Sequence, residues 1–236
     1  MTSLELSVVI PLFNEESAVE KVLQDHFQVL CNIEHQLAGY EIVCLDDGST
    51  DRTWEILQQY QKLYPSLRLL RNVHNQGITP SFNRLFYESF GKFIYLTGGD
   101  GQWPAENLII LFNEIKKTNA DIVVGVRQGR EKIYNIWRRC LSHGFNTLAE
   151  VFFKIKTEDA NGIKLGRREI FIEPLISKSF FAEIERLYLA QRHGFKIAFV
   201  PVLFVTRTSG TEKGAKLKNV LWTMSDLIRY IFLRPR

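Results

Sequence analysis

Five short runs of aliphatic and β-branched residues alternate with helical stretches through the first half of this 236-residue chain. The runs predict strands at Leu6 to Pro11, Tyr40 to Leu45, Leu67 to Leu70, Phe93 to Leu96 and Asp121 to Val126. Alternating strands and helices need crossover connections, which favour a mostly parallel sheet with helices on both faces. We therefore expect an α/β fold that binds its ligand at the carboxyl ends of the strands.

The pattern changes after Val126. A basic loop leads into a predicted helix through Phe153, and a short strand follows in "ANGIKLG". A helix near Phe180 to His193 and a strand in "KIAFVPVLFV" complete this part. We predict one domain over residues 1–215, with a nucleotide half at 1–126 and an acceptor half at 127–215, followed by an amphipathic helical tail at 216–236.

Composition excludes several classes of protein. Cys31, Cys44 and Cys140 are too few and too widely spaced for a disulfide framework or a thiolate metal site. The basic residues are not interleaved with aromatic residues on one face, so we expect no nucleic-acid partner. The sequence has no run of about 20 apolar residues and does not begin like a secretory signal, so we expect a cytoplasmic location.

Two of the loops at the predicted strand ends carry acidic residues. In "PLFNEE", Phe13 and Glu15 suit a nucleobase, but Phe13 can equally pack while Glu15 and Glu16 begin a helix. In "LDDGSTD", the neighbouring carboxylates of Asp46 and Asp47 repel unless donors approach them, such as a base amide or a ribose hydroxyl. A plain turn and helix cap is the alternative for this loop.

The third loop, "TGGDGQWP", holds a single acid. Asp100 follows a predicted strand, and Gly98, Gly99 and Gly101 let the backbone approach a ligand closely. A carboxylate here suits Mg²⁺ or Mn²⁺ bridging a diphosphate. Asp100 can equally cap the helix predicted after Pro104, and the spacing does not choose between the two.

Eight motifs in one order carry a family resemblance. They are "SVVIPLFNEE", "EIVCLDDGSTDRT", "NQGITPSFN", "GGDGQWPAE", "DIVVGVR", "RRCLSHGFN", "DANGIKL" and "FFAEIERLYLAQRHGFKIAFVPV". In this order they resemble the family 2 inverting glycosyltransferases, and within them the polyprenyl-phosphate sugar transferases of the dolichyl-phosphate mannosyltransferase kind. The resemblance covers roughly Leu6 to Gly210 and implies a GT-A fold, with a Rossmann-like sheet.

The resemblance also implies roles for residues. It assigns contacts with the nucleotide sugar, a GDP- or UDP-hexose, to Pro11, Phe13, Glu15, Asp46, Asp47, Gly77, Asn83, Gly99 and Gln102. Asp100 matches the second acid of the family's Asp-x-Asp metal motif, whereas Gly98 stands at the first acid. We expect Mg²⁺ or Mn²⁺ to bind more weakly as a result. Either Asp46 or Glu15 could compensate, or basic residues such as Arg127, Arg207 and Lys213, or catalysis could be lost.

Further candidates belong to the acceptor half. Arg127, Arg138 and Arg139 lie in a basic segment that can attract phosphate or anionic lipid, and the resemblance favours Arg127 and Arg138. It also implies that Arg207 and Ser209 belong to a mobile loop over the donor. Glu183 and Glu185 match the family's late acidic pair, with Glu185 in the position of the catalytic acid; isolated, both would be solvated acids at a helix start. The implied catalytic set is thus Asp100, Arg127, Glu185 and Arg207, and the remaining substrate contacts are Arg138, Glu183 and Ser209.

The predicted tail has apolar residues at helical spacing. The stripe, which basic residues flank, consists of Leu217, Val220, Leu221, Met224, Leu227, Ile228 and Ile231. The stripe can pack on the domain or lie on an anionic membrane, with a membrane-anchoring partner as a further possibility. We expect a peripheral enzyme that transfers a hexose to a polyprenyl phosphate at the cytosolic membrane face. The alternatives are a saccharide or protein hydroxyl acceptor, and a catalytically silent nucleotide-binding relative.

Overall fold

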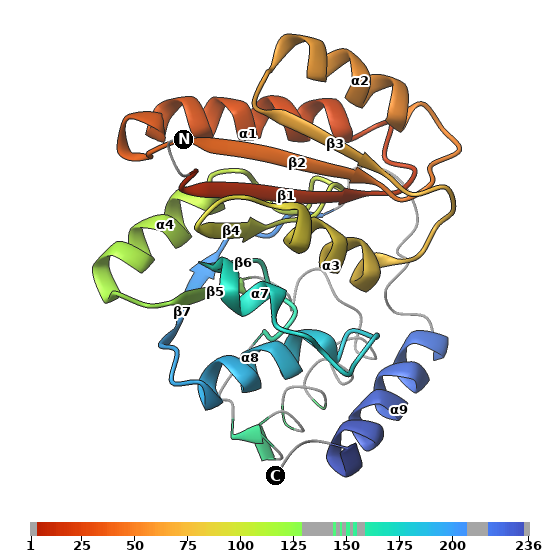
Figure 1. Ribbon diagram of the computed structural model, residues 1–236, viewed down its shortest axis with the longest axis vertical. Helices are drawn as coiled ribbons and strands as arrows, with labels where there is room; N and C mark the ends of the chain where they lie inside the picture. The colour runs from red at the N-terminus through yellow and green to blue at the C-terminus, as the bar shows by residue number, and fades with distance from the viewer. Residues whose placement is uncertain are drawn as a thin grey trace.

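The computed structural model describes residues 4–128, 159–206 and 217–233, together with 144, 147, 150, 151, 153 and 154. For 217–221 and 231–233 only the backbone is described. One sheet with the strand order β3-β2-β1-β4-β6-β5-β7 crosses this part of the molecule (Figure 1). Its strands are β1 (Leu6–Leu12), β2 (Tyr40–Asp46), β3 (Leu67–Arg71), β4 (Phe93–Leu96), β5 (Ile122–Arg127), β6 (Lys164–Arg167) and β7 (Ile197–Val202).

The five strands predicted in the first half are confirmed. Strands β1 to β4 pair in parallel, with Leu6 opposite both Tyr40 and Phe93. Strand β6 runs antiparallel between β4 and β5, and β7 then pairs in parallel with β5 at the sheet edge. The sequence pattern predicted the strand in "ANGIKLG" but not its antiparallel place between β4 and β5, because strand order depends on pairing between distant segments.

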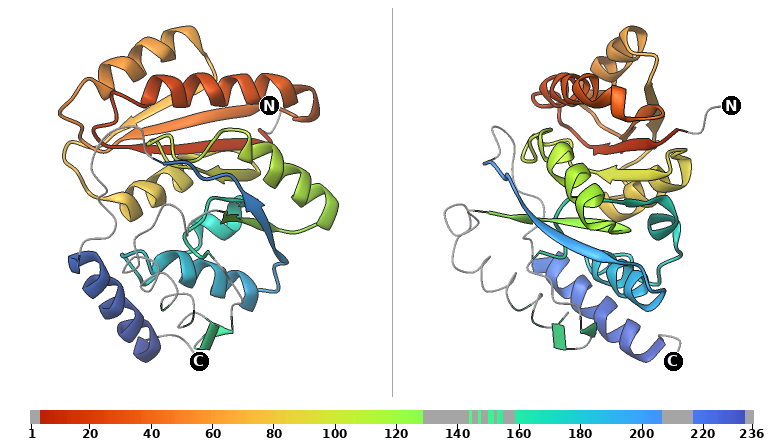
Figure 2. Two further views of the ribbon diagram at one scale, coloured as in Figure 1. Left: turned by 180° about the vertical axis from the view of Figure 1, so that it is seen from behind. Right: turned by 90° about the vertical axis from the view of Figure 1, so that its left-hand side faces the viewer.

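Helices cover both faces of the sheet, as expected (Figure 2). They are α1 (Val19–Ile33), α2 (Thr53–Leu63), α3 (Ile78–Glu88), α4 (Asn107–Thr118), α7 (Arg168–Ile172), α8 (Ala182–Arg192) and α9 (Leu217–Leu233), with a short 3-10 turn at Glu34–Gln36. Alternate strand residues divide between two cores. Val8 and Ile10 pack with α1, α2 and α4, whereas Val9 packs with α3, α7, α8 and α9.

The C-terminal helix packs on the second core. Leu227 and Tyr230 are buried, and Tyr230 meets the rings of Phe153, Phe181 and Tyr188. Met224 and Ile228, which belong to the predicted apolar stripe, are 39% and 53% exposed. Leu227 also belongs to that stripe, so the stripe is divided between the second core and the surface. No helix in the described ranges has the length and apolar character needed to cross a membrane.

Candidate active site

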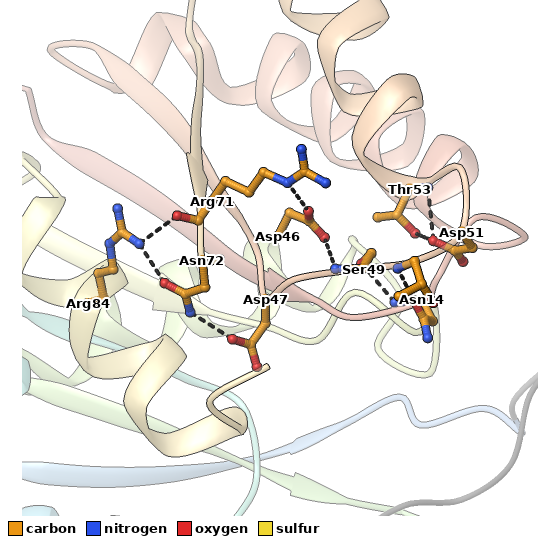
Figure 3. Close-up of polar contacts among 10 residues, drawn as sticks. Asn14, Asp46, Asp47, Ser49, Asp51, Thr53, Arg71, Asn72 and Arg84 are labelled. Carbon is orange, nitrogen blue, oxygen red and sulfur yellow. Dashed lines mark hydrogen bonds and ion pairs between the residues drawn. The ribbon is translucent and has the colours of Figure 1, made fainter. Parts of the chain in front are cut away.

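The loops after β1 and β2 are joined side by side at the carboxyl edge of the sheet (Figure 3). The Asn14 backbone N–H donates to Ser49 Oγ at 2.9 Å, and Asn14 Oδ1 accepts the Thr50 N–H at 2.8 Å. The Glu15 N–H reaches Thr53 Oγ1, and Asp51 caps α2 through the Thr53 N–H. Asn14 adopts a left-handed backbone with φ 54°, which Asn tolerates better than most residues. The two loops therefore form one unit, and α1 begins later than expected, at Val19.

Asp46 ends β2 and is fully buried. Its Oδ2 accepts Arg71 Nε at 3.0 Å, and its Oδ1 accepts the Ser49 N–H at 3.1 Å. The Arg71 guanidinium also stacks on Trp54, with 4.8 Å between its Cζ and the ring centroid. Asp46 thus stabilises the loop after β2, for which the sequence suggested a contact with the base or the ribose.

Asp47 is also bonded within the protein. Its Oδ1 accepts Asn72 Nδ2 at 2.7 Å (Figure 3). Oδ1 also accepts the Gln76 N–H at 2.9 Å, and Oδ2 accepts the Gly77 N–H at 2.8 Å. The expectation that these adjacent carboxylates need an arriving ligand is corrected, because Arg71 and backbone amides already supply the donors. A donor-sugar contact by Asp46 or Asp47 stays a prediction.

The other predicted donor contacts lie at the same edge. Pro11 and Glu15 are buried, and Phe13 is half-buried in the loop after β1. Gly77 precedes α3 with φ 94°, a conformation that favours glycine. Asn83 lies partly exposed on α3. The first loop and the start of α3 therefore meet around Asp47.

Asp100 lies in the turn between β4 and α4. Its Oδ1 accepts the Gln102 N–H at 3.2 Å. A Cβ on Gly99 would lie 2.8 Å from Leu12 Cγ and 2.9 Å from the Pro11 carbonyl oxygen, so only glycine lets this turn cross the end of β1. Gly101 has φ 71°. Asp100 is therefore held beside the first loop by a turn that requires Gly99 and favours glycine at position 101.

Side-chain amides fix this turn to the residues after β7. Asn107 is fully buried; its Nδ2 donates to the Leu203 carbonyl and its Oδ1 accepts the Leu203 N–H, both at 2.9 Å. The Val205 N–H donates to the Gln102 carbonyl at 3.0 Å, and Gln102 Nε2 donates back to the Val205 carbonyl at 3.3 Å. These hydrogen bonds hold the segment after β7 against the start of α4 and against the turn that contains Asp100.

Arg127, at the end of β5, is bound on one edge by Asp159. Arg127 Nε meets Asp159 Oδ2 at 2.6 Å and Nη2 meets Oδ1 at 2.5 Å, a bidentate pair. Its Cζ lies 5.4 Å from the centroid of the Trp103 ring and 5.3 Å from that of Phe204. Since all four groups come from different segments, the tertiary fold sets the direction of this guanidinium.

Glu183 lies between two buried cations and is not a solvated acid. Lys164 Nζ is 2.9 Å from Glu183 Oε2, and Arg186 Nε is 3.5 Å from Oε1. Lys164 also donates to the carbonyls of Ala160 and Gly162, and Arg186 stacks beneath Phe86. Burial alone would raise the pKa of Glu183, but the charges of Lys164 and Arg186 outweigh burial and lower this pKa.

Glu185 is also buried, at 1% exposure. Its Oε1 accepts the Ile176 N–H at 2.7 Å and its Oε2 accepts the Ser177 N–H at 2.9 Å. Asp226 of α9 accepts the next two amides, Lys178 and Ser179, both at 2.8 Å on Oδ2. Two carboxylates from two helices therefore hold four consecutive N–H groups of the loop before α8.

Several predicted residues lie outside the described part of the chain. These are Arg138, Arg139, Arg207, Ser209 and Lys213. Their proposed roles stay predictions.

The sequence reasoning missed Asp159, Lys164, Arg186, Asn107 and Asp226. Each is a polar or charged side chain that bonds a residue from another segment, so the pairing is visible only in the fold. Lys164 and Asp226 carry the one available signal, a lone charge within an apolar run.

The described residues fit a weak divalent site rather than a complete one. No three His, Cys, Asp or Glu side chains among them converge in a way that could hold a metal ion. Asp100 offers a hard carboxylate, and its Oδ2 makes no contact with the described residues. Mg²⁺ typically keeps several waters and takes one or two carboxylates plus substrate phosphates. Asp100 alone can therefore hold such an ion together with a diphosphate.

Solved structures share the fold of this chain. Over 98% of this chain the structure resembles glucosyl-3-phosphoglycerate synthase from Mycobacterium tuberculosis, crystallised with Mn²⁺ and UDP, with a TM-score of 0.70 at 17% identity and 81% of that chain covered. A mannosyltransferase from Pyrobaculum calidifontis in complex with GDP-Man and Mn²⁺ gives a TM-score of 0.68 at 15% identity over 96% of this chain and 64% of its own. The fold is of the GT-A type.

Sequence comparison shows the family. The pattern of "Glycosyl transferase family 2" matches residues 7–174. A dolichyl-phosphate beta-glucosyltransferase from Trichomonas vaginalis is 30% identical over 96% of this chain and 73% of its own length. A dolichol-phosphate mannosyltransferase from Pyrococcus furiosus is 27% identical over 97% of this chain, which spans 63% of that relative. The chain belongs to glycosyl transferase family 2 and is a nucleotide-sugar glycosyltransferase.

Proposed function

We propose that this enzyme transfers a hexose, with inversion, from a GDP- or UDP-sugar to the phosphate of a polyprenyl phosphate. Two of the relatives described above support this proposal by their names, a dolichyl-phosphate beta-glucosyltransferase and a dolichol-phosphate mannosyltransferase. They are 30% and 27% identical over most of this chain. A phosphate oxygen attacks the anomeric carbon as the bond to the leaving diphosphate breaks. The products are a sugar phosphodiester and a nucleoside diphosphate.

The surroundings of Glu183 and Glu185 carry this proposal. A hydroxyl acceptor needs a base that it can reach and whose pKa is suitable. Glu185 is buried and holds a backbone amide on each oxygen, and the pKa of Glu183 is lowered between two cations. A phosphate acceptor, with its second pKa near about 6, is largely ionised at neutral pH and needs no base. We therefore assign Glu185 as a positioning residue for the loop before α8.

Asp100 supplies the carboxylate for Mg²⁺ or Mn²⁺ in this proposal. The metal would neutralise charge that develops on the leaving diphosphate. The structural neighbours were crystallised with Mn²⁺ or Mg²⁺ and nucleotide. Arg127 is the described cation beside this turn and would contact the diphosphate or the acceptor phosphate.

A transfer assay tests the function. Purified protein is given GDP- and UDP-sugars, a short polyprenyl phosphate or the matching polyprenol, and Mn²⁺, Mg²⁺ or chelator. We expect metal-dependent transfer to the phosphate alone, reduced about 100-fold or more in Asp100→Ala. Transfer to the alcohol would identify a hydroxyl acceptor. Nucleotide binding without turnover, restored by Gly98→Asp, would identify a silent relative.

Substitution of Glu185 gives a second test of whether the acceptor is a phosphate or a hydroxyl. A positioning role predicts that Glu185→Gln lowers the melting temperature and kcat together, because one backbone N–H loses its acceptor. The shape of the pH profile should stay the same. Loss of the low-pH limb of the profile with unchanged stability would instead make Glu185 a general base.

We further propose that α9 holds the enzyme on an anionic membrane and is part of the domain rather than a detached tail. Its outward residues include exposed Met224 and Ile228. The five basic residues of 216–236 are opposed by Asp226 alone, and Asp226 points inward to Lys178 and Ser179. The outer side of α9 thus combines these apolar side chains with the exposed Arg229. Sedimentation with phosphatidylserine vesicles should weaken in Met224→Asp/Ile228→Asp but not in Lys21→Met, and equal binding would overturn the proposal.

A further inference from the structure

The position of Gly98 faces an indole ring. A Cβ built on Gly98 would lie 3.4 Å from Trp103 Cδ1 and 3.8 Å from Trp103 Nε1, and 3.2 Å from Asp100 Oδ1. The backbone there is not in the left-handed region, so a side chain is conformationally allowed. The space left open by this glycine is therefore bounded by the nitrogen edge of Trp103 and by the single acid.

Trp103 brings an unused donor to this space. The ring is half-buried, and its N–H makes no hydrogen bond with the described residues. Indole nitrogen is only a donor, and a tryptophan at a partly buried site usually finds an acceptor. The available partner beside Asp100 is a ligand oxygen.

Neighbouring groups keep the indole in place. Phe204 meets the Trp103 ring edge-on at 4.8 Å, and the Arg127 guanidinium lies over its face. Phe204 is fixed in turn because Asn107 binds Leu203 in both directions. Since Asp159 balances the charge of Arg127, this side of the turn offers directed N–H groups more than net charge.

We propose that Trp103 Nε1–H donates a hydrogen bond to the diphosphate of the nucleotide at the place where Gly98 leaves room. This inference rests on the proposed assignment of Asp100 to the donor diphosphate. It makes Trp103 a diphosphate-binding residue rather than a packing residue. Tryptophan at this position then donates a hydrogen bond that phenylalanine cannot donate.

Calorimetric binding of UDP and uridine, and of GDP and guanosine, tests the proposal with Mn²⁺ present. Trp103→Phe keeps the ring and removes the N–H. We expect it to weaken binding of the diphosphate that binds by about 5- to 10-fold, the effect of one hydrogen bond, and to leave binding of its nucleoside unchanged. Trp222→Phe, on the exposed part of α9, is the matched control and should bind both as the parent protein does.

A direct signal accompanies the affinity. The chain has four tryptophans, and the indole proton resonance absent from Trp103→Phe identifies Trp103. On titration with the diphosphate that resonance should move downfield, and it should not move with the nucleoside. Equal weakening for diphosphate and nucleoside, or a resonance that stays in place, would overturn the proposal. Failure to bind any nucleotide in the parent protein would instead count against the proposed function.

A double-mutant cycle gives an independent test. In Gly98→Asp the new carboxylate lies within reach of the indole N–H and becomes its acceptor. Trp103→Phe should therefore lose its effect on diphosphate affinity in the Gly98→Asp background. An unchanged 5- to 10-fold effect in that background would show that the indole serves the ligand from elsewhere.

Discussion

The two halves of the molecule use paired acids in different ways. Asp46 and Asp47 bind Arg71, Asn72 and amides of adjoining loops, so they shape the ends of two neighbouring strands. Glu183 and Glu185 bind cations and amides brought from across the second core. Both pairs resemble ligand-binding acids in the sequence, yet the protein uses both internally. Asp100, a lone acid, is the one of these five with a carboxylate oxygen unused by the described residues.

The difference lies in the charge that each half buries. The pair at the nucleotide half meets mostly backbone donors and a half-exposed arginine. The acceptor half instead encloses Lys164 and Arg186 almost completely. Breaking a buried charge pair leaves an uncompensated ion, which is more destabilising than losing a pair that water can reach. Variants in the two halves should therefore differ in size of effect.

The largest expected effect is that of Glu183→Gln. Lys164 and Arg186 would lose their shared counterion, and the free energy of unfolding should fall by about 3 kcal/mol. Urea unfolding measures this. Glu169→Gln, an exposed acid of α7, is the control and should change stability by less than about 0.5 kcal/mol. Equal effects of the two variants would mean that the acceptor half does not depend on its buried charges.

Next comes Gly99→Ala in the turn between β4 and α4. The added Cβ would press on Leu12 and the Pro11 carbonyl, and we expect a loss of about 2 kcal/mol in thermal unfolding. Gly98→Ala meets only side-chain atoms of Asp100 and Trp103, so its loss should be clearly smaller. The reverse order would contradict the described turn.

Arg71→Met probes the nucleotide half. Asp46 is fully buried but the Arg71 side chain is 47% exposed, so solvent screens the pair and a loss of about 1 kcal/mol is expected by urea unfolding. The surface pair Lys21 and Asp25 provides the control, because Lys21→Met should have little effect. A loss as large as that of Glu183→Gln would remove the contrast between the halves.

The smallest effect is a dependence of stability on acid. The pKa of Glu183 is lowered from its ordinary 4.5 in the folded state, so its contribution is fully present above pH 4.5 and is lost as pH falls through the lowered value. Unfolding curves between pH 6 and pH 3 should show this loss. Glu183→Gln should lack that part of the slope, and an identical slope in both proteins would contradict the assignment.

Much of the site could be located from the sequence. Strands ending at Leu12, Asp46 and Leu96 place the three loops at one edge, because parallel strands share the direction of their carboxyl ends. The lone acid and the glycines that carry it were likewise visible. Neither Asp159 beside Arg127 nor Lys164 beside Glu183 could be found this way, because these partners are more than 15 residues apart and meet only through β6 and its preceding turn.

The sequence by itself determined the alternation of strands and helices, the edge at which the three candidate loops lie and the family. Local periodicity and ordered motifs suffice for these, since they depend on neighbouring residues. Tertiary structure alone decided where the antiparallel β6 inserts, which face of α9 is buried and which acids are already bonded. Those outcomes depend on contacts between segments that are distant in the sequence. For the acids, a buried charge is tolerated only where distant donors converge on it.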